Sequence, residues 1–244
     1  GIIAAQFIGE FIMCLVLAGP ALRALRAGFH WNSLRDQLLY GLPLVPAGVA
    51  SFVLHLIDRW FLKEYYSVSE VGIYSLGYRF GEIIAFVVTA FQLSWPQFIF
   101  RNLKEPNAPQ LYAQMGVYYM ASLLFLWLGL SAFSGDLIRL MATPAFYPAA
   151  SVVPIIGFGL VLEGFNHMVK PGILITKKTY FRTITIFVAA LVNVALLFWL
   201  IKPFGMVGAA WANVGGFLVQ VFLTLDRKST RLNSSHSSVS RMPS

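Results

Sequence analysis

Charged side chains are scarce in this sequence. Lysine, arginine, aspartate and glutamate together make up 11% of the 244 residues, whereas hydrophobic residues make up 58%. A soluble globular domain carries about 25% charged residues. A soluble chain of this composition would expose too much apolar surface to stay dissolved, and the mean hydropathy of +0.71 agrees with this. The composition therefore excludes a soluble domain and indicates a membrane protein.

Cysteine and the usual motifs of enzyme sites are also scarce or missing. The single cysteine, Cys14, allows no intramolecular disulfide, and its place inside an apolar run is typical of a small core residue. The sequence has no metal-ligand cluster, no glycine-rich phosphate loop and no convincing serine–histidine–aspartate arrangement. We therefore expect no catalytic residues, no metal, no cofactor and no enzymatic activity.

Seven apolar runs are present, each close to the length of about 20 residues that a helix needs to cross the hydrocarbon core. Long uninterrupted runs exclude a transmembrane β-barrel, whose strands alternate in short segments. The connections are short and leave no room for a soluble domain. We expect an all-α, polytopic transmembrane bundle with consecutive helices antiparallel. The runs are 1–22, 38–57, 71–95, 111–133, 147–169, 183–201 and 206–225.

The last segment, 226–244, is polar and serine-rich, without apolar periodicity. One interpretation is a disordered cytoplasmic tail. We favour a non-native tail, because residues 226–236 resemble the translation of a sequencing-library adapter and 240–244 its continuation. Without this segment 14 basic and 9 acidic residues remain, so the formal net charge falls from +8 to +5. The basic pI is therefore no sign of a nucleic-acid partner. The first residue is not Met and lies in an apolar run, which predicts a truncated N-terminus.

Basic residues favour one set of predicted loops, and short basic loops face the cytoplasm. Nine lie in one set: Arg23, Arg26, Arg35, Arg101, Lys104, Lys170, Lys177, Lys178 and Arg182. Four lie in the other set: Arg59, Lys63, Arg139 and Lys202. The first set should be cytoplasmic.

A polar stripe marks the run 71–95. At about 100° per residue, Ser75, Arg79, Glu82 and Thr89 fall within a sector of about 80°. An ionisable residue in a membrane helix is a functional candidate. Arg79 could face a water-filled cavity and hold a phosphate with its planar guanidinium, beside Glu82 and Ser75 as substrate-binding residues. Alternatively, Arg79 pairs with Glu82 and locks helices together, or reaches back to the outer interface.

Two other runs also carry polar faces. One lies near the predicted outer end of the run 38–57, and the other lies deep within the run 1–22. Ser51, His55 and Asp58 share one helix face, and His55 with Asp58 could form a protonatable pair for ion coupling. We favour the alternative that they are interfacial residues near the outer end, where polarity costs little. In the run 1–22, Gln6 and Glu10 share a face. Glu10 should face protein or water, and it is a further candidate for ion coupling or gating.

The run 147–169 has its polar residues near the predicted cytoplasmic end. Glu163, Asn166, His167 and Lys170 follow a spacing of three, four and seven residues, which places them on one face. Glu163 and His167 could form an inner gate or contact a lipid head group. The cluster could equally be a capped helix end at the water boundary.

Seven short segments, in order and spacing, resemble the flippases of polysaccharide biosynthesis, including the O-antigen type. These belong to the multidrug/oligosaccharidyl-lipid/polysaccharide exporter superfamily. The resemblance covers 38–225. The segments are GLPLVPAG (41–48), DRWFL (58–62), SEVGIYSLGYRFGE (69–82), FQLSWPQF (91–98), PAFYPAASVVPIIGFG (144–159), GILITKKT (172–179) and FGMVGAAWA (204–212).

The resemblance implies two six-helix lobes around a central cavity. Residues 1–22 would be the last helix of the N-terminal lobe, 23–37 a basic cytoplasmic connector, and 38–225 the C-terminal lobe. The partners would be the missing N-terminal lobe, membrane lipid and a lipid-linked oligosaccharide. The implied function is transfer of an undecaprenyl-diphosphate-linked oligosaccharide across the bacterial inner membrane, for surface polysaccharide such as the O-antigen of lipopolysaccharide. Arg79 matches the position of an arginine that would meet the diphosphate.

Other functions remain open. A drug or cation antiporter of the same superfamily would need a cavity dominated by carboxylates, whereas the best candidate here is an arginine beside a glutamate. A polysaccharide polymerase or ligase would carry a large periplasmic loop, and the sequence has none. A purely structural membrane protein is the remaining alternative.

Overall fold

The computed structural model describes residues 2–25, 31–42, 44–169 and 180–239, and these are helical apart from short turns. No strand occurs in these ranges, so the predicted all-α class is confirmed for the described chain. The elements are α1 (Ile2–Leu25), α2 (Trp31–Gly41), α3 (Leu44–Tyr65), α4 (Val68–Asn102), α5 (Ala108–Met141), the 3₁₀ helix η1 (Pro144–Ser151), α6 (Val153–Val169) and α8 (Tyr180–Val239).

The chain forms two compact units, 1–43 and 44–244. The first unit holds α1 and α2, and the side chains described on α1 are mostly exposed. Cys14 is among the exposed ones, so the predicted core position is wrong. The physical reason is that α2, the other helix of this unit, has only 11 residues and covers little of the 24-residue α1.

Four helices are long and apolar enough to cross a membrane: Val45–Tyr65, Val68–Asn102, Ala108–Met141 and Thr183–Asp226. They become five if η1 and α6, which are bent by 45° at their junction, form one span. The chain is therefore a multi-pass membrane protein. Seven spans were predicted. The difference arises because α1 contains only the shorter apolar helix Phe7–Gly19 among the described residues, and because two predicted runs lie within α8.

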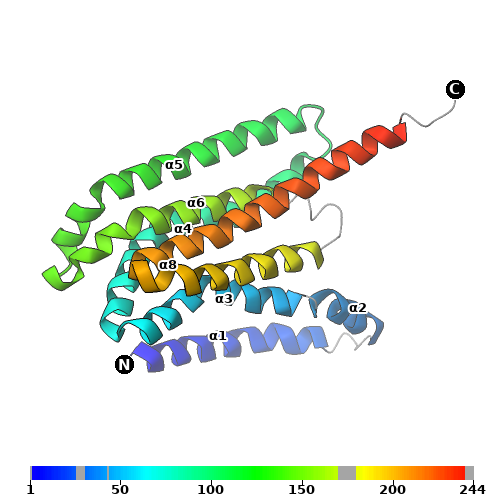
Figure 1. The fold of residues 1–244 in the computed structure, drawn as a ribbon. Coiled ribbons are helices and arrows are strands. Elements are labelled where there is room, and N and C mark those ends of the chain that lie inside the picture. Colours follow the sequence, from blue (N-terminus) through cyan, green and yellow to red (C-terminus); the bar gives the residue numbers. More distant parts are fainter. Residues whose placement is uncertain (1, 26–30, 43, 170–179, 240–244) are drawn as a thin grey trace. The chain divides into compact units, whose positions relative to one another are not determined.

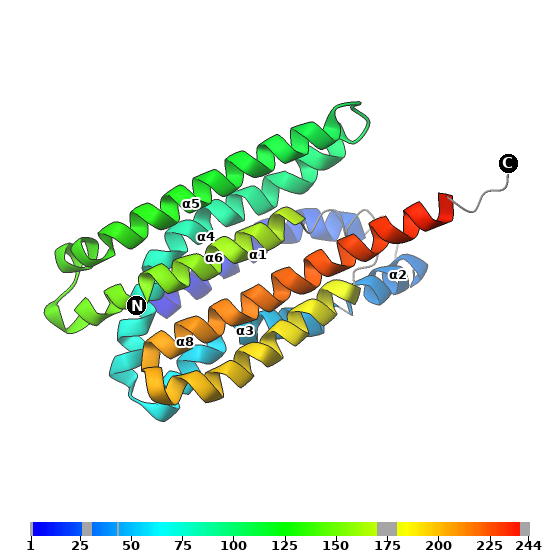
Figure 2. The ribbon, with the colours of Figure 1, turned by 45° about the horizontal axis from the view of Figure 1, so that its top comes forward.

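Element α8 consists of two helical arms that meet at Gly205. Its φ of +54° and ψ of −130° are non-helical, and the positive φ is a conformation that glycine adopts without the cost a side chain would bring. The arms run antiparallel, as the yellow and orange ribbons show in both views (Figures 1 and 2). The Tyr66 hydroxyl donates to the carbonyl oxygens of Ile201 and Lys202, each at 3.0 Å. This bond fixes the reversal to the chain between α3 and α4.

Helix α3 occupies different residues from the predicted run 38–57. It begins at Leu44, with Pro46 in its first turn, where a missing N–H costs nothing. It ends at Tyr65, and Ser67 then caps α4 by accepting a hydrogen bond from the Glu70 N–H at 3.3 Å. Asp58, Arg59 and Lys63 were expected at or beyond the helix end, but they lie inside α3.

The turns of the second unit alternate between two ends (Figure 1). Arg101 and Lys104 lie at the turn between α4 and α5. Lys63, Arg139 and Lys202 lie close to turns at the opposite end. This separation agrees with the predicted partition of basic residues. The prediction that the first end is cytoplasmic stays a prediction, and Lys170, Lys177 and Lys178 lie outside the described residues.

Helix α6 is the centre of the second unit, and it packs against α4, α5 and α8, while α3 packs chiefly on α8. Glycines at these contacts let the helices approach closely, as small residues do in membrane bundles. A Cβ atom on Gly81 would lie 2.8 Å from the Ile156 side chain, and one on Gly164 would lie 2.6 Å from Leu123. The core therefore depends on glycine at specific sites.

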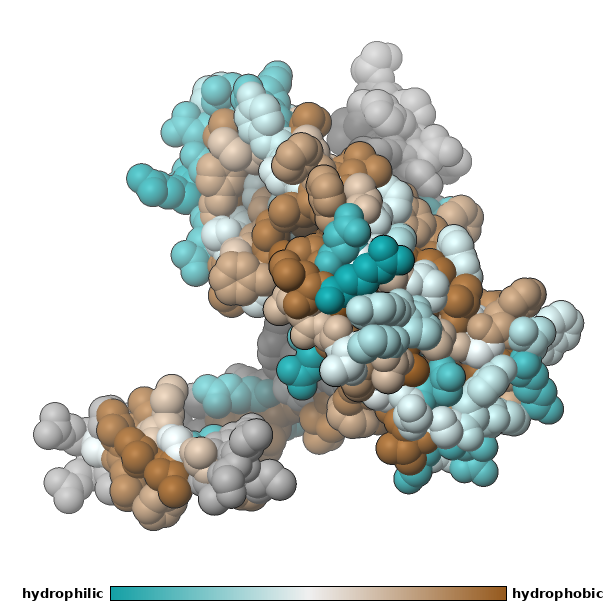
Figure 3. Space-filling model, turned by 90° about the vertical axis from the view of Figure 1, so that its left-hand side faces the viewer, coloured by the Kyte–Doolittle hydropathy of each residue, from teal (hydrophilic) through white to brown (hydrophobic). Residues whose placement is uncertain are grey.

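The outer surface of the helices is apolar. Phe86, Phe125, Leu140 and Trp199 are each at least 78% exposed. Apolar side chains cover large parts of the face drawn in Figure 3. A soluble monomer rarely exposes apolar patches of this extent, whereas lipid covers such a surface in a membrane.

Replacing Gly77 with alanine tests the packing of α4 on the chain at η1. A Cβ atom at Gly77 would lie 2.5 Å from Val152 Cγ2 and 3.1 Å from the Ala149 carbonyl oxygen. Overpacking of this kind costs about 1–3 kcal/mol, so we expect a lower midpoint of thermal unfolding in detergent. Gly129→Ala is the matched control, because nothing lies within 4 Å of its Cβ position. Equal midpoints for the two variants would contradict the close packing.

Candidate functional site

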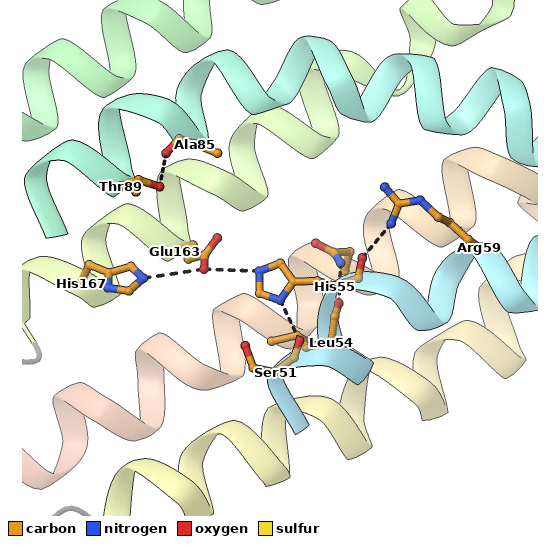
Figure 4. Close-up of polar contacts among 9 residues, drawn as sticks. Ser51, Leu54, His55, Arg59, Ala85, Thr89, Glu163 and His167 are labelled. Carbon is orange, nitrogen blue, oxygen red and sulfur yellow. Dashed lines mark hydrogen bonds and ion pairs between the residues drawn. The ribbon is translucent and has the colours of Figure 1, made fainter. Parts of the chain in front are cut away.

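The structure brings together candidate residues from two distant parts of the sequence. His55 of α3 and Glu163 and His167 of α6 meet inside the second unit (Figure 4). His55 Nε2 lies 3.3 Å from Glu163 Oε1, and His167 Nε2 lies 3.7 Å from the same oxygen. We call these three residues the His–Glu–His cluster. Their side chains are between 10% and 31% exposed, so the cluster is largely enclosed by protein.

Local helix geometry orients the cluster. His55 Nδ1 lies 2.8 Å from the carbonyl oxygen of Ser51, one helical turn earlier. The opposite side of the His55 ring meets Phe217 of α8 edge to face, with centroids 5.5 Å apart. Glu163 and His167 are four residues apart on α6, so they lie on the same helix face. These contacts hold the His55 ring with Nε2 directed at Glu163.

A cavity of about 380 Å³ adjoins the cluster. Helices α3, α4, α6 and α8 all contribute to its walls. Its lining residues are Ala47, Gly48, Ser51, Leu54, His55, Gln92, Glu163, His167, Ile186 and Gln220. Sequence analysis missed Gln92 and Gln220. Each is a polar residue within an apolar run, and that signal alone would have marked them as candidates.

Asp58 is not part of this cluster. It is fully buried, and its Oδ2 accepts a hydrogen bond of 2.5 Å from the Tyr74 hydroxyl of α4. Its Oδ1 accepts from the backbone N–H of Arg59 at 2.8 Å. The predicted pair with His55 is absent, because His55 contacts Glu163 instead. The favoured interpretation of a polar residue near the outer end is also wrong for Asp58, because α3 continues to Tyr65 and packs this carboxylate against α4.

Arg59 is the charged neighbour of Asp58. Its Nη1 donates to the His55 carbonyl oxygen at 2.9 Å and lies 3.7 Å from Asp58 Oδ1. The guanidinium also lies over the Tyr78 ring, 4.5 Å from its centroid, which is a cation–π distance. Asp58, Arg59, Tyr74 and Tyr78 therefore form a polar contact between α3 and α4.

The stripe predicted on α4 lies mainly on its exposed face. Arg79, Glu82 and Thr89 are exposed and Ser75 is half-buried. Arg79 and Glu82, both described, form no ion pair with each other, so the predicted i, i+3 pair is not present. Thr89 bonds its own helix, through the carbonyl oxygen of Ala85 at 2.8 Å (Figure 4). Arg79 is free to meet an anion at this surface.

The remaining candidates lie elsewhere. Glu10 is exposed on α1, in the first unit. Asn166 is buried, and its Oδ1 accepts from the Thr224 hydroxyl at 3.3 Å, so it joins α6 to α8 and does not lie at a water boundary. Lys170 and the side chain of Gln6 lie outside the described residues. Within the described ranges, no group of three or more His, Cys, Asp or Glu residues is placed to hold a metal ion.

Removing the Tyr74 hydroxyl tests the buried contact of Asp58. In Tyr74→Phe the Asp58 carboxylate loses one of its donors, which costs about 1–3 kcal/mol when a buried group is left unpaired. We expect a matching fall in the thermal midpoint of the protein in detergent. Tyr118→Phe is the control, because this tyrosine is 59% exposed. A Tyr74→Phe protein as stable as the control would show that the bond contributes nothing to the packing of α3 on α4.

Comparisons of this chain with protein-family models, with curated proteins and with solved structures found no match. Two features of the described residues bear on function: the exposed stripe of α4 and the enclosed His–Glu–His cluster with its cavity.

Proposed function

We propose that this chain is the C-terminal lobe region of a flippase for lipid-linked polysaccharide units. The observation that carries the proposal is the exposed stripe of α4, with Arg79 and Glu82 on the surface of an otherwise apolar bundle. Hydrocarbon gives no hydrogen-bond partners, and a charged side chain facing lipid is costly. A water-filled space or a second protein surface must therefore cover the stripe. A second lobe facing a shared cavity satisfies this need.

The chemistry of the stripe fits an anionic head group. Arg79 presents a planar guanidinium that can bond two phosphate oxygens at once, and it has no carboxylate partner in the described structure. The Glu82 carboxylate can accept hydrogen bonds from sugar hydroxyls close to the phosphates, and the Ser75 hydroxyl can accept or donate them. The lipid tail would stay in the bilayer while the head group crosses between the lobes, which alternate between inward and outward openings.

The helix count of the second unit is compatible with a six-helix lobe. The proposal assigns α3, α4, α5, the bent pair of η1 and α6, and the two arms of α8 to six spans. The seven short segments that resemble polysaccharide flippases all lie within 41–212. The proposal locates the protein in the bacterial inner membrane, with an undecaprenyl-diphosphate-linked oligosaccharide as its substrate.

A drug or cation antiporter of the same superfamily is the second candidate. The observation in its favour is Glu163, a carboxylate beside a cavity of about 380 Å³. A cationic substrate would compete there with two histidines that already contact the same oxygen. An anionic substrate at Arg79 has no such competitor, so the flippase is the better supported of the two.

Complementation separates the two candidates. The complete gene that contains this chain would be expressed in a bacterium that lacks its own flippase and makes no surface polysaccharide. Restored surface polysaccharide supports the flippase. Well-expressed protein without restoration, in strains that make several different glycans, together with altered sensitivity to cationic drugs, would overturn it in favour of the antiporter.

Arg79 should be essential in that assay. Arg79→Ala removes the charge and both phosphate bonds, and we expect loss of at least 10-fold in surface polysaccharide, since one bidentate charged contact is worth roughly 1.5–3 kcal/mol. Arg79→Lys keeps the charge but not the planar fork, so partial activity is expected. Arg101→Ala, an exposed arginine in the last turn of α4, is the matched control. Protein level in the membrane is measured for every variant, and normal output from Arg79→Ala would contradict the assigned role.

A further inference from the structure

The His–Glu–His cluster holds more hydrogen-bond acceptors than donors unless it carries an extra proton. A backbone carbonyl oxygen can only accept, so the 2.8 Å contact with Ser51 requires a hydrogen on His55 Nδ1. A neutral imidazole has one N–H, so Nε2 would then bear a lone pair. That nitrogen lies 3.3 Å from Glu163 Oε1. A lone pair facing a carboxylate oxygen at this distance is repulsive.

One proton between His55 and Glu163 removes the repulsion. On His55 it gives an imidazolium that donates to the carboxylate, and on Glu163 it gives a carboxylic acid that donates to Nε2. A neutral His167 with its hydrogen on Nε2 can donate to the same oxygen, 3.7 Å away. The geometry of His55 and Glu163 by itself calls for one added proton.

We propose that the contact between His55 of α3 and Glu163 of α6 is a proton-binding site that controls access to the adjoining cavity. The ligand is a proton because the described cluster does not have the arrangement that holds a metal ion. Imidazole is the side chain that changes charge near neutral pH, and the adjoining cavity gives a route for proton exchange. The site does not depend on the identity of the transported substrate.

The surroundings of the site contain few competing charges. On α3, the Asp58 carboxylate interacts electrostatically with His55 at longer range. The Arg59 guanidinium lies in direct contact with Asp58 and offsets its negative charge. On α4 and α5, the phenols of Tyr78 and Tyr119 are the titratable groups within electrostatic reach of Glu163.

Apart from the cluster itself, the described residues that line the cavity are uncharged. From α8, the described lining residues are Gln220 and Ile186, and Gln92 lines the cavity from α4. His167 is the remaining charged or titratable partner of Glu163. The proton balance of the cluster therefore rests mainly on His55, Glu163 and His167.

The direction of the pH effect follows from the geometry. With the proton present, His55 and Glu163 attract, and this side-chain contact ties α3 to α6 beside the cavity. Loss of the proton at higher pH restores the repulsion between the Nε2 lone pair and the carboxylate. The contact is therefore tight at low pH and weakened as pH rises, and the cavity becomes more accessible.

Nuclear magnetic resonance of the chain with ¹⁵N-labelled histidine, in lipid nanodiscs, tests the site directly. The His55 signal is assigned by its absence in His55→Gln. At about pH 7 we expect either both ring nitrogens of His55 protonated, or one protonated and a carboxylic acid band from Glu163 in the infrared spectrum. A His55 with one protonated nitrogen and no such band between about pH 5 and about pH 7 would overturn the proposal.

Glu163→Gln supplies the second arm of the test. The amide can donate a hydrogen to Nε2, so His55 should become neutral at about pH 7. Glu105→Gln, an exposed carboxylate between α4 and α5, is the matched control and should leave the His55 signal unchanged. If His55 carries the proton in the native protein, an unchanged His55 signal in a folded Glu163→Gln protein would overturn the proposal. If Glu163 carries it, a carboxylic acid band that persists in Glu163→Gln would overturn the proposal.

Accessibility of the cavity gives a readout that does not require an assigned spectrum. Ser51→Cys keeps the backbone carbonyl that His55 contacts and places a thiol at the cavity wall. The rate at which a neutral reagent labels this thiol is divided by the rate measured in the double variant that also carries Glu163→Gln. This ratio removes the intrinsic effect of pH on the thiol. We expect at least a several-fold rise in the normalised rate between about pH 6 and about pH 8. A ratio that does not change with pH would contradict the coupling between this proton and access to the cavity.

None of these measurements involves transport, so a failed flippase assay would leave this result unaffected.

Discussion

The surrounding hydrocarbon offers no hydrogen-bond partner, and the described structure is organised by that constraint. Polar side chains in the second unit bond across helices: Asp58 to Tyr74, Asn213 to the Leu54 carbonyl, and Trp127 to the Pro154 carbonyl. Each bond satisfies a polar group and joins two elements at the same time. Polar contacts of this kind, together with glycines at close approaches, join helices whose buried side chains are mainly apolar.

The same constraint separates the polar groups of the bundle into two kinds. Groups such as Asp58 and Asn166 are buried and bonded, so their first role is to hold helices together. Arg79 and Glu82 are exposed and unbonded, which is stable in a membrane only next to water or further protein. A binding function is therefore expected at the exposed, unbonded groups. The His–Glu–His cluster is intermediate, because it is largely enclosed but adjoins a cavity.

Apolar runs were enough to predict that α3, α4, α5 and α6 exist, and the period of 3.6 residues was enough to predict the α4 stripe. The end of α3 was not predictable. Asp58, Arg59 and Lys63 are charged residues of the kind found in loops, and only the structure shows that the Tyr74 hydroxyl lies beside Asp58. The partner of His55 was not predictable for a similar reason. Glu163 lies on another helix, and no periodicity within one segment can indicate such a contact. The helix pattern did place Glu163 and His167 on one face, as observed.

The two sites share helices, and this gives a physical route between them. Helix α4 carries the stripe and packs on both α3 and α6, the two helices that the cluster joins. The strongest polar link on that route is the bond from Tyr74 to Asp58, one turn from His55 on α3 and next to Ser75 on α4. A shift of α3 relative to α6 would strain this bond unless α4 moved as well. Proton loss at the cluster and a change in the surface around Arg79 would then be two consequences of one rearrangement, and by linkage an anion bound at Arg79 would alter proton affinity at the cluster in return.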